Sequence, residues 1–341
     1  MKVTVNTPNK TYDIIIDKLP QITIDSKVAI ITNPKVSGLH INYLTNKLKA
    51  KELHIITLPD GEEYKNWQSI EYALDRLFDA KFDRNSTLIA FGGGVIGDMT
   101  GFAASIFLRG IKFIQIPTTL LAMVDSSVGG KTGINNKYGK NLIGSFYQPE
   151  AVYIDTHFLS TLDKREFAAG MAEIIKMAVM FDKEFFENIK KGNLTLEEMI
   201  KRSVELKAEV VNQDEKEKGI RSVLNYGHTF GHVIENLTNY KTYLHGEAVA
   251  IGMIMANELS RELGLLSEKE AKEIKELLEK HNLPTDFKID DVDDFYNHFF
   301  LDKKTADNKI KFIIPEKIGQ YKIVKDLDEN LVKKVLKKFE R

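Results

Sequence analysis

The sequence contains no cysteine among its 341 residues. Without thiols the chain can form no disulfide, and any bound metal must be held by His, Asp or Glu. Long apolar runs are also missing: those present, such as residues 248–256, are about half of what a membrane span needs. The first residues, MKVTVN, lack the apolar segment of a signal peptide. We therefore expect a cytoplasmic protein that has no membrane partner.

A strong charge of either sign is absent as well. The 48 Lys and Arg residues nearly balance the 49 Asp and Glu residues, and the net charge of −1 predicts no binding to nucleic acid. Any anionic substrate must then be held by local clusters of Lys and Arg. Since 341 residues exceed the length at which one hydrophobic core usually stops growing, two domains are expected.

The first half of the chain alternates between strand and helix patterns. Short apolar runs predict strands at residues 11–17, 27–32, 54–59, 86–91, 112–117 and 151–155. Helices are predicted between them at residues 38–50, 65–80 and 97–108. This alternation indicates a mostly parallel sheet covered by helices, an atypical Rossmann-like α/β domain over residues 1–157.

The second half, residues 158–341, has a helical period and predicts a mainly α-helical domain. Helices are expected at residues 165–180 and 194–213, and a capping box at residues 267–270 begins another that ends near Pro284. Two short apolar segments, 311–315 and 320–324, predict a small hairpin. The charged run at residues 214–218 predicts a solvated loop.

A glycine cluster, GGGVIGD at residues 92–98, follows one of the buried strands. A strand that turns on glycines into a helix N-terminus presents unpaired N–H groups to a phosphate. Gly92, Gly94 and Gly97 have the dinucleotide-binding spacing, although glycines needed only for a tight turn are an equal alternative.

The acidic residue that usually binds the ribose is missing. It should lie about 20 residues past the glycines, where this chain has IPTT at residues 116–119. A dinucleotide would then take its ribose partner from Asn33 or from the loop at Glu62.

Three of the eight histidines are close in sequence. His228 and His232 are four residues apart, on one helical face, and His245 follows. Clustered imidazoles are the favoured zinc ligands in a cysteine-free chain, and a catalytic zinc takes three protein ligands. Glu173 lies in an apolar helix, where an unpaired charge is costly to bury. These residues predict a metal site of Glu173 and two histidines, and which two stays open.

Ordinary structural roles are the alternative for the same residues. The histidines could be satisfied core or surface side chains, and Glu173 could pair with Lys176 or with the next helix. Arg221 and Asn225 precede His228 by seven and three positions, so they share its helical side if that helix begins early enough. Lys207 by itself indicates a surface position.

A segment rich in glycine and lysine follows the glycine cluster. Residues 125–135 read DSSVGGKTGIN and residues 139–145 read GKNLIGS. Lys131 and Lys140 stand among small residues, where backbone and side chain can both approach an anion. Exposed turns are the alternative. Arg109 ends the preceding helix, where the helix dipole alone favours a cation.

Taken together, these strings resemble the 3-dehydroquinate synthases, a family of sugar-phosphate cyclases. The resemblance runs from about residue 60 to residue 318 and is carried by residues 92–98, 117–119, 125–133, 139–141 and 225–229. The form of the run at 125–132 is that of dehydroquinate synthases rather than of other cyclases. The first 50 residues match only by pattern.

The resemblance implies the site residues. Glu173, His228 and His245 would bind one divalent metal, Zn or Co, and His232 would serve as a substrate or proton-transfer group. The implied NAD contacts are Asp60, Glu62, Lys65, Gly93, Gly94, Val95, Asp98, Thr118, Thr119, Lys131, Lys140, Phe158 and Thr161. The implied substrate contacts are Arg109, Asp125, Lys131, Asn141, Lys176, Lys207, Arg221, Asn225, His232 and one of Lys303 and Lys304.

The resemblance also implies an activity and a homodimer. A phosphorylated sugar acid would be converted to 3-dehydroquinate by transient oxidation, phosphate elimination and ring closure, in a cleft between the two domains. The main alternative is an NAD- and metal-dependent polyol dehydrogenase such as a glycerol dehydrogenase. A non-enzymatic nucleotide-binding protein is a further alternative, which would have no reason to retain Glu173, His228, His245 and Lys131.

Overall fold

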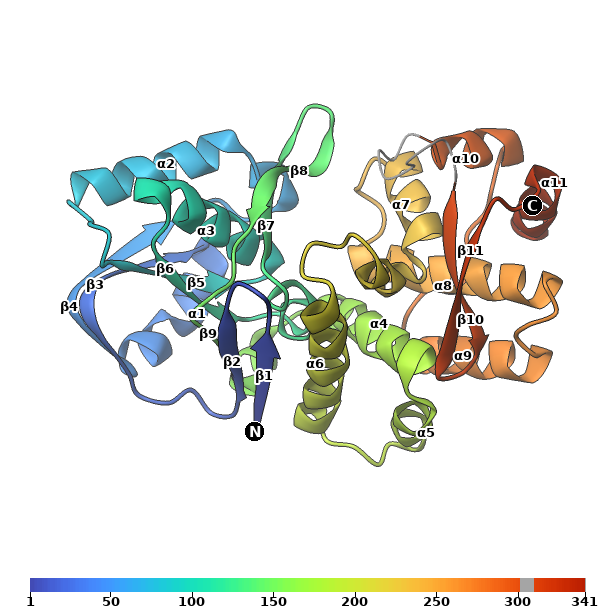
Figure 1. Ribbon diagram of the computed structural model, residues 1–341, viewed down its shortest axis with the longest axis horizontal. Helices are drawn as coiled ribbons and strands as arrows, with labels where there is room; N and C mark the ends of the chain where they lie inside the picture. The colour runs from blue at the N-terminus through green and yellow to red at the C-terminus, as the bar shows by residue number, and fades with distance from the viewer. Residues whose placement is uncertain (301–309, 341) are drawn as a thin grey trace. The chain divides into compact units, whose positions relative to one another are not determined.

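The computed structural model describes residues 1–300 and 310–340. The chain divides into two compact units (Figure 1). The first comprises Met1–Asp163 and Leu196–Glu217, and the second comprises Lys164–Thr195 and the chain from Lys218 onward. The sequence predicts a division of the chain into two continuous segments at residue 157. The structure differs, because residues 196–217 return to the first unit. Among the described residues, no helix is long and apolar enough to cross a membrane.

A seven-stranded sheet forms the centre of the first unit. Its strands, in chain order, are β1 (Lys2–Asn6), β2 (Thr11–Ile16), β3 (Ile22–Thr32), β4 (Leu48–Thr57), β5 (Thr87–Gly92), β6 (Lys112–Pro117) and β9 (Ala151–Ile154). They lie in the order β1-β2-β9-β6-β5-β3-β4, and every neighbouring pair except β1–β2 is parallel. The predicted, mostly parallel α/β architecture is confirmed, and β1 is an addition to it.

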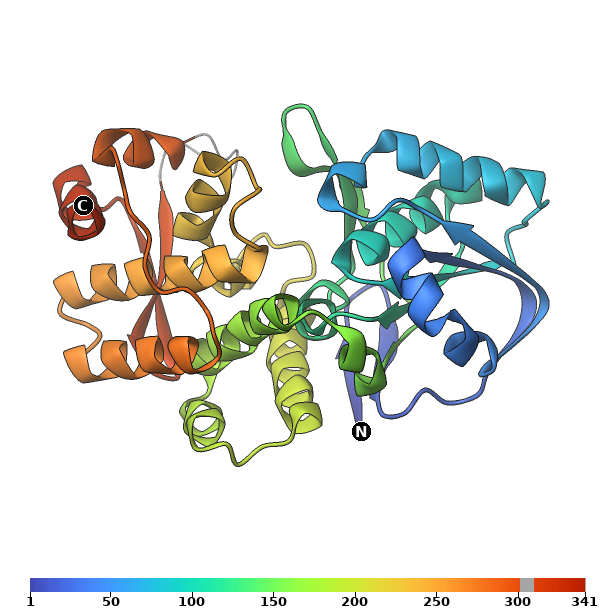
Figure 2. The same cartoon turned by 180° about the vertical axis from the view of Figure 1, so that it is seen from behind.

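Helices cover both faces of this sheet (Figures 1 and 2). On one face α2 (Trp67–Asp79) and α3 (Gly94–Ile106) bury Leu77 and Met99 in a core shared with β3 and β5. The other face is covered by α1 (Pro34–Thr45), which begins four residues earlier than predicted. Asn33 caps its first turn by accepting a hydrogen bond from the Val36 amide, and Pro34 fits the first helical position.

A β-hairpin that the sequence analysis did not predict follows the sheet's sixth strand. It pairs β7 (Lys131–Asn136) with β8 (Gly139–Phe146). Gly133 stands opposite Gly144, and a Cβ on Gly133 would lie 2.5 Å from the Ile143 carbonyl oxygen. The close approach of the two strands requires glycine there, whereas glycine normally argues against a strand. The glycines that argued against a strand in the sequence are therefore the residues that allow the two strands to pair.

The second unit is mainly helical. Its helices are α4 (Lys164–Phe181), α5 (Lys183–Lys191), α7 (His228–Leu237), α8 (His245–Glu262), α9 (Glu268–Lys280), α10 (Val292–His298) and α11 (Glu329–Leu336). The predicted hairpin is present as β10 (Lys311–Lys317) and β11 (Gln320–Lys325). The capping box of Ser267 and Glu270 opens α9 as predicted. One further helix, α6 (Leu196–Gln213), packs against β1 in the first unit.

Glycines let the helices of the second unit touch through their backbones. A Cβ on Gly252 of α8 would lie 2.0 Å from the carbonyl oxygen of Gly227, the residue that precedes α7. A Cβ on Gly246 would lie 2.1 Å from the Ala169 carbonyl oxygen of α4. Because these neighbours are backbone atoms, they cannot rotate away. The N-terminal parts of α7 and α8 are therefore held at the distances that glycine allows.

We expect Gly252→Ala to lower the free energy of unfolding by about 3 kcal/mol or more, because the clash with backbone exceeds ordinary overpacking. The urea midpoint of the purified protein measures this. Gly38→Ala is the matched control: it lies inside α1 with nothing within 4 Å of the new Cβ, so it should be neutral or stabilise by about 0.5–1 kcal/mol. Equal midpoints for the two variants would contradict the backbone contact.

Candidate active site

Three predicted metal ligands meet in the second unit. Glu173 lies on α4, His228 is the first residue of α7 and His245 is the first residue of α8. One ligand atom of each can be chosen such that all three lie within 4.8 Å of one another. The close packing of these helices at Gly227, Gly246 and Gly252 brings their ends together. His232, one turn along α7, has its ring 5.6 Å from that of His228.

The Glu173 carboxylate is buried, with 1% of the residue exposed, and its two oxygens differ. Oε2 forms an ion pair with Lys176, which is itself 2% exposed. Oε1 has no hydrogen-bond partner within the described chain and lies 3.7 Å from Nε2 of His228. The alternative ion pair with Lys176 therefore exists, and it leaves half of the carboxylate unsatisfied.

His228 presents a lone pair to that oxygen. Burial, together with the charges of Lys176, His245 and His232, holds the pKa of His228 well below its ordinary value. Its Nδ1 lies 3.2 Å from the Tyr226 carbonyl oxygen, which can only accept, so the proton sits on Nδ1 and Nε2 is bare. Two acceptor atoms that face each other in a buried site repel each other, and a cation between them would satisfy both. The donor set fits a divalent transition metal.

A second carboxylate orients the third ligand. Nδ1 of His245 lies 3.4 Å from Oε1 of Glu235, a residue of α7 that is 5% exposed. An outer carboxylate of this kind fixes the tautomer of a metal-binding histidine and raises its basicity. Helix α8 is also anchored to α4, because Arg165 donates to both oxygens of Glu247 at 2.5 and 2.6 Å. Glu235 and Glu247 are not among the predicted site residues.

In the first unit, the predicted cofactor residues gather at the carboxyl ends of the strands, as parallel architecture requires. Gly93 precedes α3, and no side chain caps the helix at this residue. Next to it, Thr118 at the end of β6 has a buried hydroxyl with no partner in the described residues. Uncapped N–H groups and an unsatisfied hydroxyl fit a phosphate-bearing cofactor such as NAD.

The glycines of this turn also have a packing role. A Cβ on Gly94 would lie 2.9 Å from Oγ of Ser126, and one on Gly97 would lie 2.9 Å from Oε1 of Gln115. The structural alternative therefore accounts for these two positions whether or not a phosphate binds.

Lys65 is the buried cation of this region. It donates to Asp98 at 2.5 Å and to the side-chain oxygen of Asn141 at 2.6 Å, and 4% of the residue is exposed. Burial alone would lower the pKa of Lys65, but the negative charges of Asp98 and Glu62 outweigh it and raise the pKa. The cation therefore persists at neutral pH. Two predicted NAD contacts and one predicted substrate contact meet at this amine.

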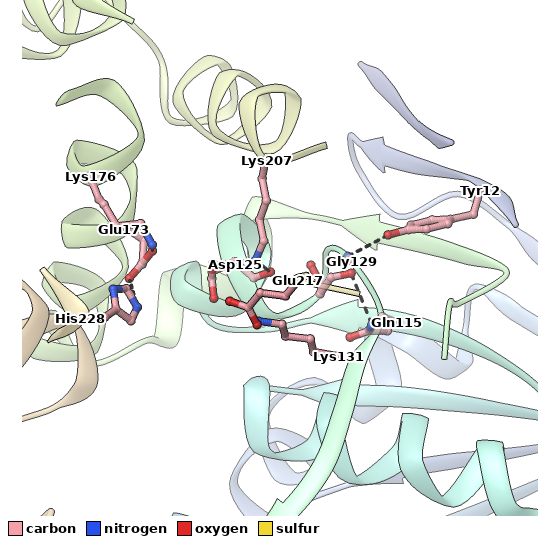
Figure 3. A network of polar contacts seen from close by, with 11 residues as sticks. Tyr12, Gln115, Asp125, Gly129, Lys131, Glu173, Lys176, Lys207, Glu217 and His228 are labelled. Atoms are coloured by element: carbon pink, nitrogen blue, oxygen red, sulfur yellow. Dashed lines mark hydrogen bonds and ion pairs between the residues drawn. The ribbon is translucent and has the colours of Figure 1, made fainter. Parts of the chain in front are cut away.

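Two further lysines carry acidic partners (Figure 3). Lys207 of α6 donates to Asp125 Oδ1 at 2.6 Å and to its carbonyl oxygen at 2.5 Å. With 6% of the residue exposed, Lys207 is not the surface side chain that the sequence by itself indicated. Lys131 of β7 pairs with Glu217 at 2.5 Å, so Asp125, Lys131 and Lys207 all belong to charged contacts of the first unit.

Comparisons with known proteins agree with this geometry. The 3-dehydroquinate synthase N-terminal family profile matches residues 55–169, and its C-terminal profile matches residues 170–305. The chain belongs to the 3-dehydroquinate synthase family.

Relatives of this family match the chain along its whole length. It is 68% identical to a 3-dehydroquinate synthase of Sulfurovum sp., over 98% of this chain and 97% of that protein. It is 54% identical to the one of Campylobacter jejuni, over 100% of both chains.

Solved cyclases share the fold. A 2-deoxy-scyllo-inosose synthase, complexed with carbaglucose-6-phosphate, NAD⁺ and Co²⁺, has a TM-score of 0.85 and 26% identity, covering 99% of this chain and 100% of that one. A 2-epi-5-epi-valiolone synthase from Streptomyces hygroscopicus, with NAD⁺ and Zn²⁺ bound, has a TM-score of 0.86 and 26% identity over 96% of both chains. A probable glycerol dehydrogenase from Sinorhizobium meliloti has a TM-score of 0.59 and 13% identity over 96% of both chains, so it shares the fold alone.

Several other predicted site residues lie apart from the contacts described above for the metal ligands and the lysines. Arg109 is exposed in a left-handed stretch (φ +70°), and no hydrogen bond or ion pair in the described chain joins it to the other predicted residues. Phe158 is buried among aromatic rings, and Oγ1 of Thr161 lies 2.7 Å from Nε2 of His40. Lys303 and Lys304 fall outside the described residues.

Four other predicted residues belong to the first unit. Asp60 accepts a hydrogen bond from Asn33 at 2.8 Å. Thr119 caps the turn that follows it by accepting from the Ala122 amide, and Val95 lies in the first turn of α3. Lys140 lies in β8.

Two expectations about the helical half were wrong. Arg221 and Asn225 do not share a helix with His228, because α7 begins at His228 and a separate 3₁₀ turn covers Ile220–Asn225. Nor is the run at residues 214–218 simply solvated. Glu215 is 6% exposed and accepts hydrogen bonds from Asn9 and Gln148, and Glu217 reaches Lys131. Alternating charges carry no sign of such distant partners, so the sequence offered no signal for Glu217.

Replacing the metal-binding carboxylate should remove the metal without unfolding the protein. We expect Glu173→Gln to weaken zinc binding by at least about 100-fold, because loss of even an outer partner costs 10- to 100-fold. Competition with a chromophoric chelator measures the affinity. Glu184→Gln, which changes an exposed acid on α5, should leave it unchanged. Wild-type zinc affinity in Glu173→Gln would contradict the assignment of this ligand.

Proposed function

We propose that the chain converts 3-deoxy-D-arabino-heptulosonate 7-phosphate to 3-dehydroquinate and inorganic phosphate. The observation that carries the proposal is Lys176, a cation kept 2% exposed beside the metal ligands. Its ion pair with Glu173 accounts for the burial, and once a metal compensates that carboxylate the ammonium group is available to a phosphate, which the substrate of a polyol dehydrogenase lacks. Family membership and full-length similarity to synthases support the same substrate class, a phosphorylated sugar-type small molecule.

In this proposal each unit has its own task. The first unit supplies the NAD contacts, and its Gly93–Asp98 turn, Thr118 and Lys65 are the groups that fit the cofactor. The second supplies Glu173, His228 and His245 for the metal. NAD held by these first-unit residues would supply reversible hydride transfer, and a metal held by Glu173, His228 and His245 would supply polarisation of a substrate hydroxyl group.

The chain's own residues then govern phosphate loss and ring closure. Oxidation acidifies the adjacent C–H bond, so the phosphate can leave when its dianion is stabilised. Lys131, Lys176, Lys207 and Arg221, with Arg109, are the proposed cationic contacts. Asp125, Asn141 and Asn225 would hold the hydroxyl and carboxylate groups in one conformer for the intramolecular aldol step. His232, beside the metal ligands, would transfer protons.

We also propose a cytoplasmic homodimer with no nucleic-acid or membrane partner. The absence of cysteine suits a reducing compartment, and the net charge of −1 attracts neither polyanion. Helix α2 exposes Trp67 by 49% and Phe78 by 56% on one side, and a second copy would cover these apolar side chains. Sedimentation velocity should give twice the monomer mass, and a monomer at micromolar concentration would contradict the dimer.

The decisive assay measures phosphate release. With the heptulosonate phosphate, catalytic NAD and zinc, we expect steady phosphate release without net accumulation of NADH, because the hydride is returned in each cycle. Chelation of the metal should abolish turnover, and zinc or cobalt should restore it. Release of one NADH per turnover would instead identify the polyol dehydrogenase, and binding of NAD without any turnover would identify a regulatory protein.

A further inference from the structure

The β7–β8 hairpin has a break in its ladder at Asn135. Ile134 pairs with Ile143, but Asn136 pairs with Gly139, so Asn135 stands opposite the three residues 140–142. Bulges of this kind occur next to active sites, where they redirect side chains. Because Asn135 has no partner in the β7–β8 ladder, its backbone N–H and its side chain can bind other groups.

Asn135 uses these groups to hold the predicted cofactor loop. Its backbone N–H donates to the Lys65 carbonyl oxygen at 2.8 Å. Its side-chain amide donates to Oε1 of Glu62 at 2.8 Å and approaches the Glu62 carbonyl oxygen at 3.3 Å. Both ends of the short 3₁₀ turn that contains Glu62 are thereby tied to one residue of the hairpin.

The same side chain holds a predicted substrate residue. Oδ1 of Asn135 accepts the backbone N–H of Asn141 at 2.9 Å. Asn141 has a left-handed backbone (φ +54°), a conformation that asparagine tolerates better than most residues. Its own side-chain oxygen accepts from Lys65, which also binds Asp98. The contacts form a closed circuit from Glu62 through Asn135 and Asn141 to Lys65.

We propose that Asn135 is a positioning residue that joins the NAD-binding loop at residues 62–65 to the substrate-binding residue Asn141. The proposal rests on the proposed function, since it takes Glu62 and Lys65 as cofactor contacts and Asn141 as a substrate contact. In this role Asn135 acts on both ligands through its protein partners. It sets the direction of the Glu62 carboxylate through its amide and the backbone of Asn141 through its oxygen.

The two hydrogen bonds can be separated by one substitution. Asn135→Asp keeps an oxygen for the Asn141 N–H but replaces the donor to Glu62, so two carboxylates face each other. We expect the dissociation constant of NAD⁺ to rise about tenfold, the low end for a hydrogen bond to a charged group, since these side chains are partly exposed. The KM of the heptulosonate phosphate should rise less than about threefold, because the Asn141 contact remains. Asn135→Ala, which loses both bonds, should raise both constants.

The matched control is Asn136→Asp. It adds the same charge one residue further along β7, and an aspartate oxygen can still accept the Tyr138 N–H as Asn136 does at 2.8 Å. Its NAD⁺ affinity and KM should remain those of the wild type. The change Asn135→Asp is also made on a Glu62→Gln background, where the amide and the carboxylate are exchanged. Because the bond between the two side chains can then re-form, Asn135→Asp should cost much less NAD⁺ affinity on that background than in the wild type.

Calorimetric titration of the zinc-loaded protein with NAD⁺ gives the dissociation constants, and phosphate release gives kcat and KM. Equal NAD⁺ affinity in Asn135→Asp and Asn136→Asp would overturn the proposal, as would an equal loss of affinity from Asn135→Asp in the wild type and on the Glu62→Gln background. Should Asn135→Asp fail to fold, Asn135→Ala against Asn136→Ala carries the same comparison of both constants, and unchanged constants would likewise overturn it. A wild-type protein that binds NAD⁺ but releases no phosphate would contradict the proposed function instead, and the NAD⁺ titrations would still decide the role of Asn135 toward Glu62.

Discussion

The Glu173 carboxylate imposes the strictest physical condition on the second unit. A buried negative charge must be compensated, and Lys176 compensates only one of its oxygens. The other oxygen faces the bare nitrogen of a neutral histidine. This pair of acceptors is unfavourable in an apolar interior until a cation arrives. The helix contacts around it, from α4 to α8, therefore preserve an arrangement that the protein alone does not stabilise.

In the first unit the charged groups to be compensated are lysines. Lys65, Lys131 and Lys207 each have a carboxylate partner at 2.5–2.6 Å. The partners hold the ammonium groups in fixed positions, at the cost of weakening their field for a phosphate. The attraction between an anionic ligand and each lysine is therefore weaker than it would be without the acidic partner. Fixed pairs of this kind favour orientation over raw attraction, which suits a reaction that must keep one conformer of its substrate.

Much of this arrangement could be predicted from the sequence because it depends on local patterns. Apolar runs gave the strands, so the positions of Asp60, the glycine cluster and Thr118 at strand ends followed from parallel topology. The residue pattern gave Glu173 and two of three histidines, and the resemblance to the synthases named His228 and His245; these three residues meet as expected. Contacts between distant segments left no such trace. Glu217 approaches Lys131 across 86 residues, and Glu235 approaches His245 from another helix.

Spacing also misled where a local conformation changes. The regular offsets of Arg221 and Asn225 from His228 implied one helix, but Gly227 takes a left-handed conformation (φ +82°) and starts α7 anew. The glycine-rich composition around Gly133 and Gly144 concealed a hairpin, because only the paired geometry shows why side chains are excluded there. A single sequence shows that a glycine is present, but it does not show which neighbouring atoms leave no room for a side chain.

The seam between α7 and α8 has a consequence for how damage spreads in this protein. Where side chains interdigitate, a small displacement is absorbed by rotation about single bonds. At Gly227, Gly231 and Gly252 the nearest neighbour is a main-chain atom, which can yield only by moving a whole helix. Each of these helices begins with a candidate metal ligand. A single added methyl group on the seam would thus weaken metal binding in addition to lowering the stability of the fold.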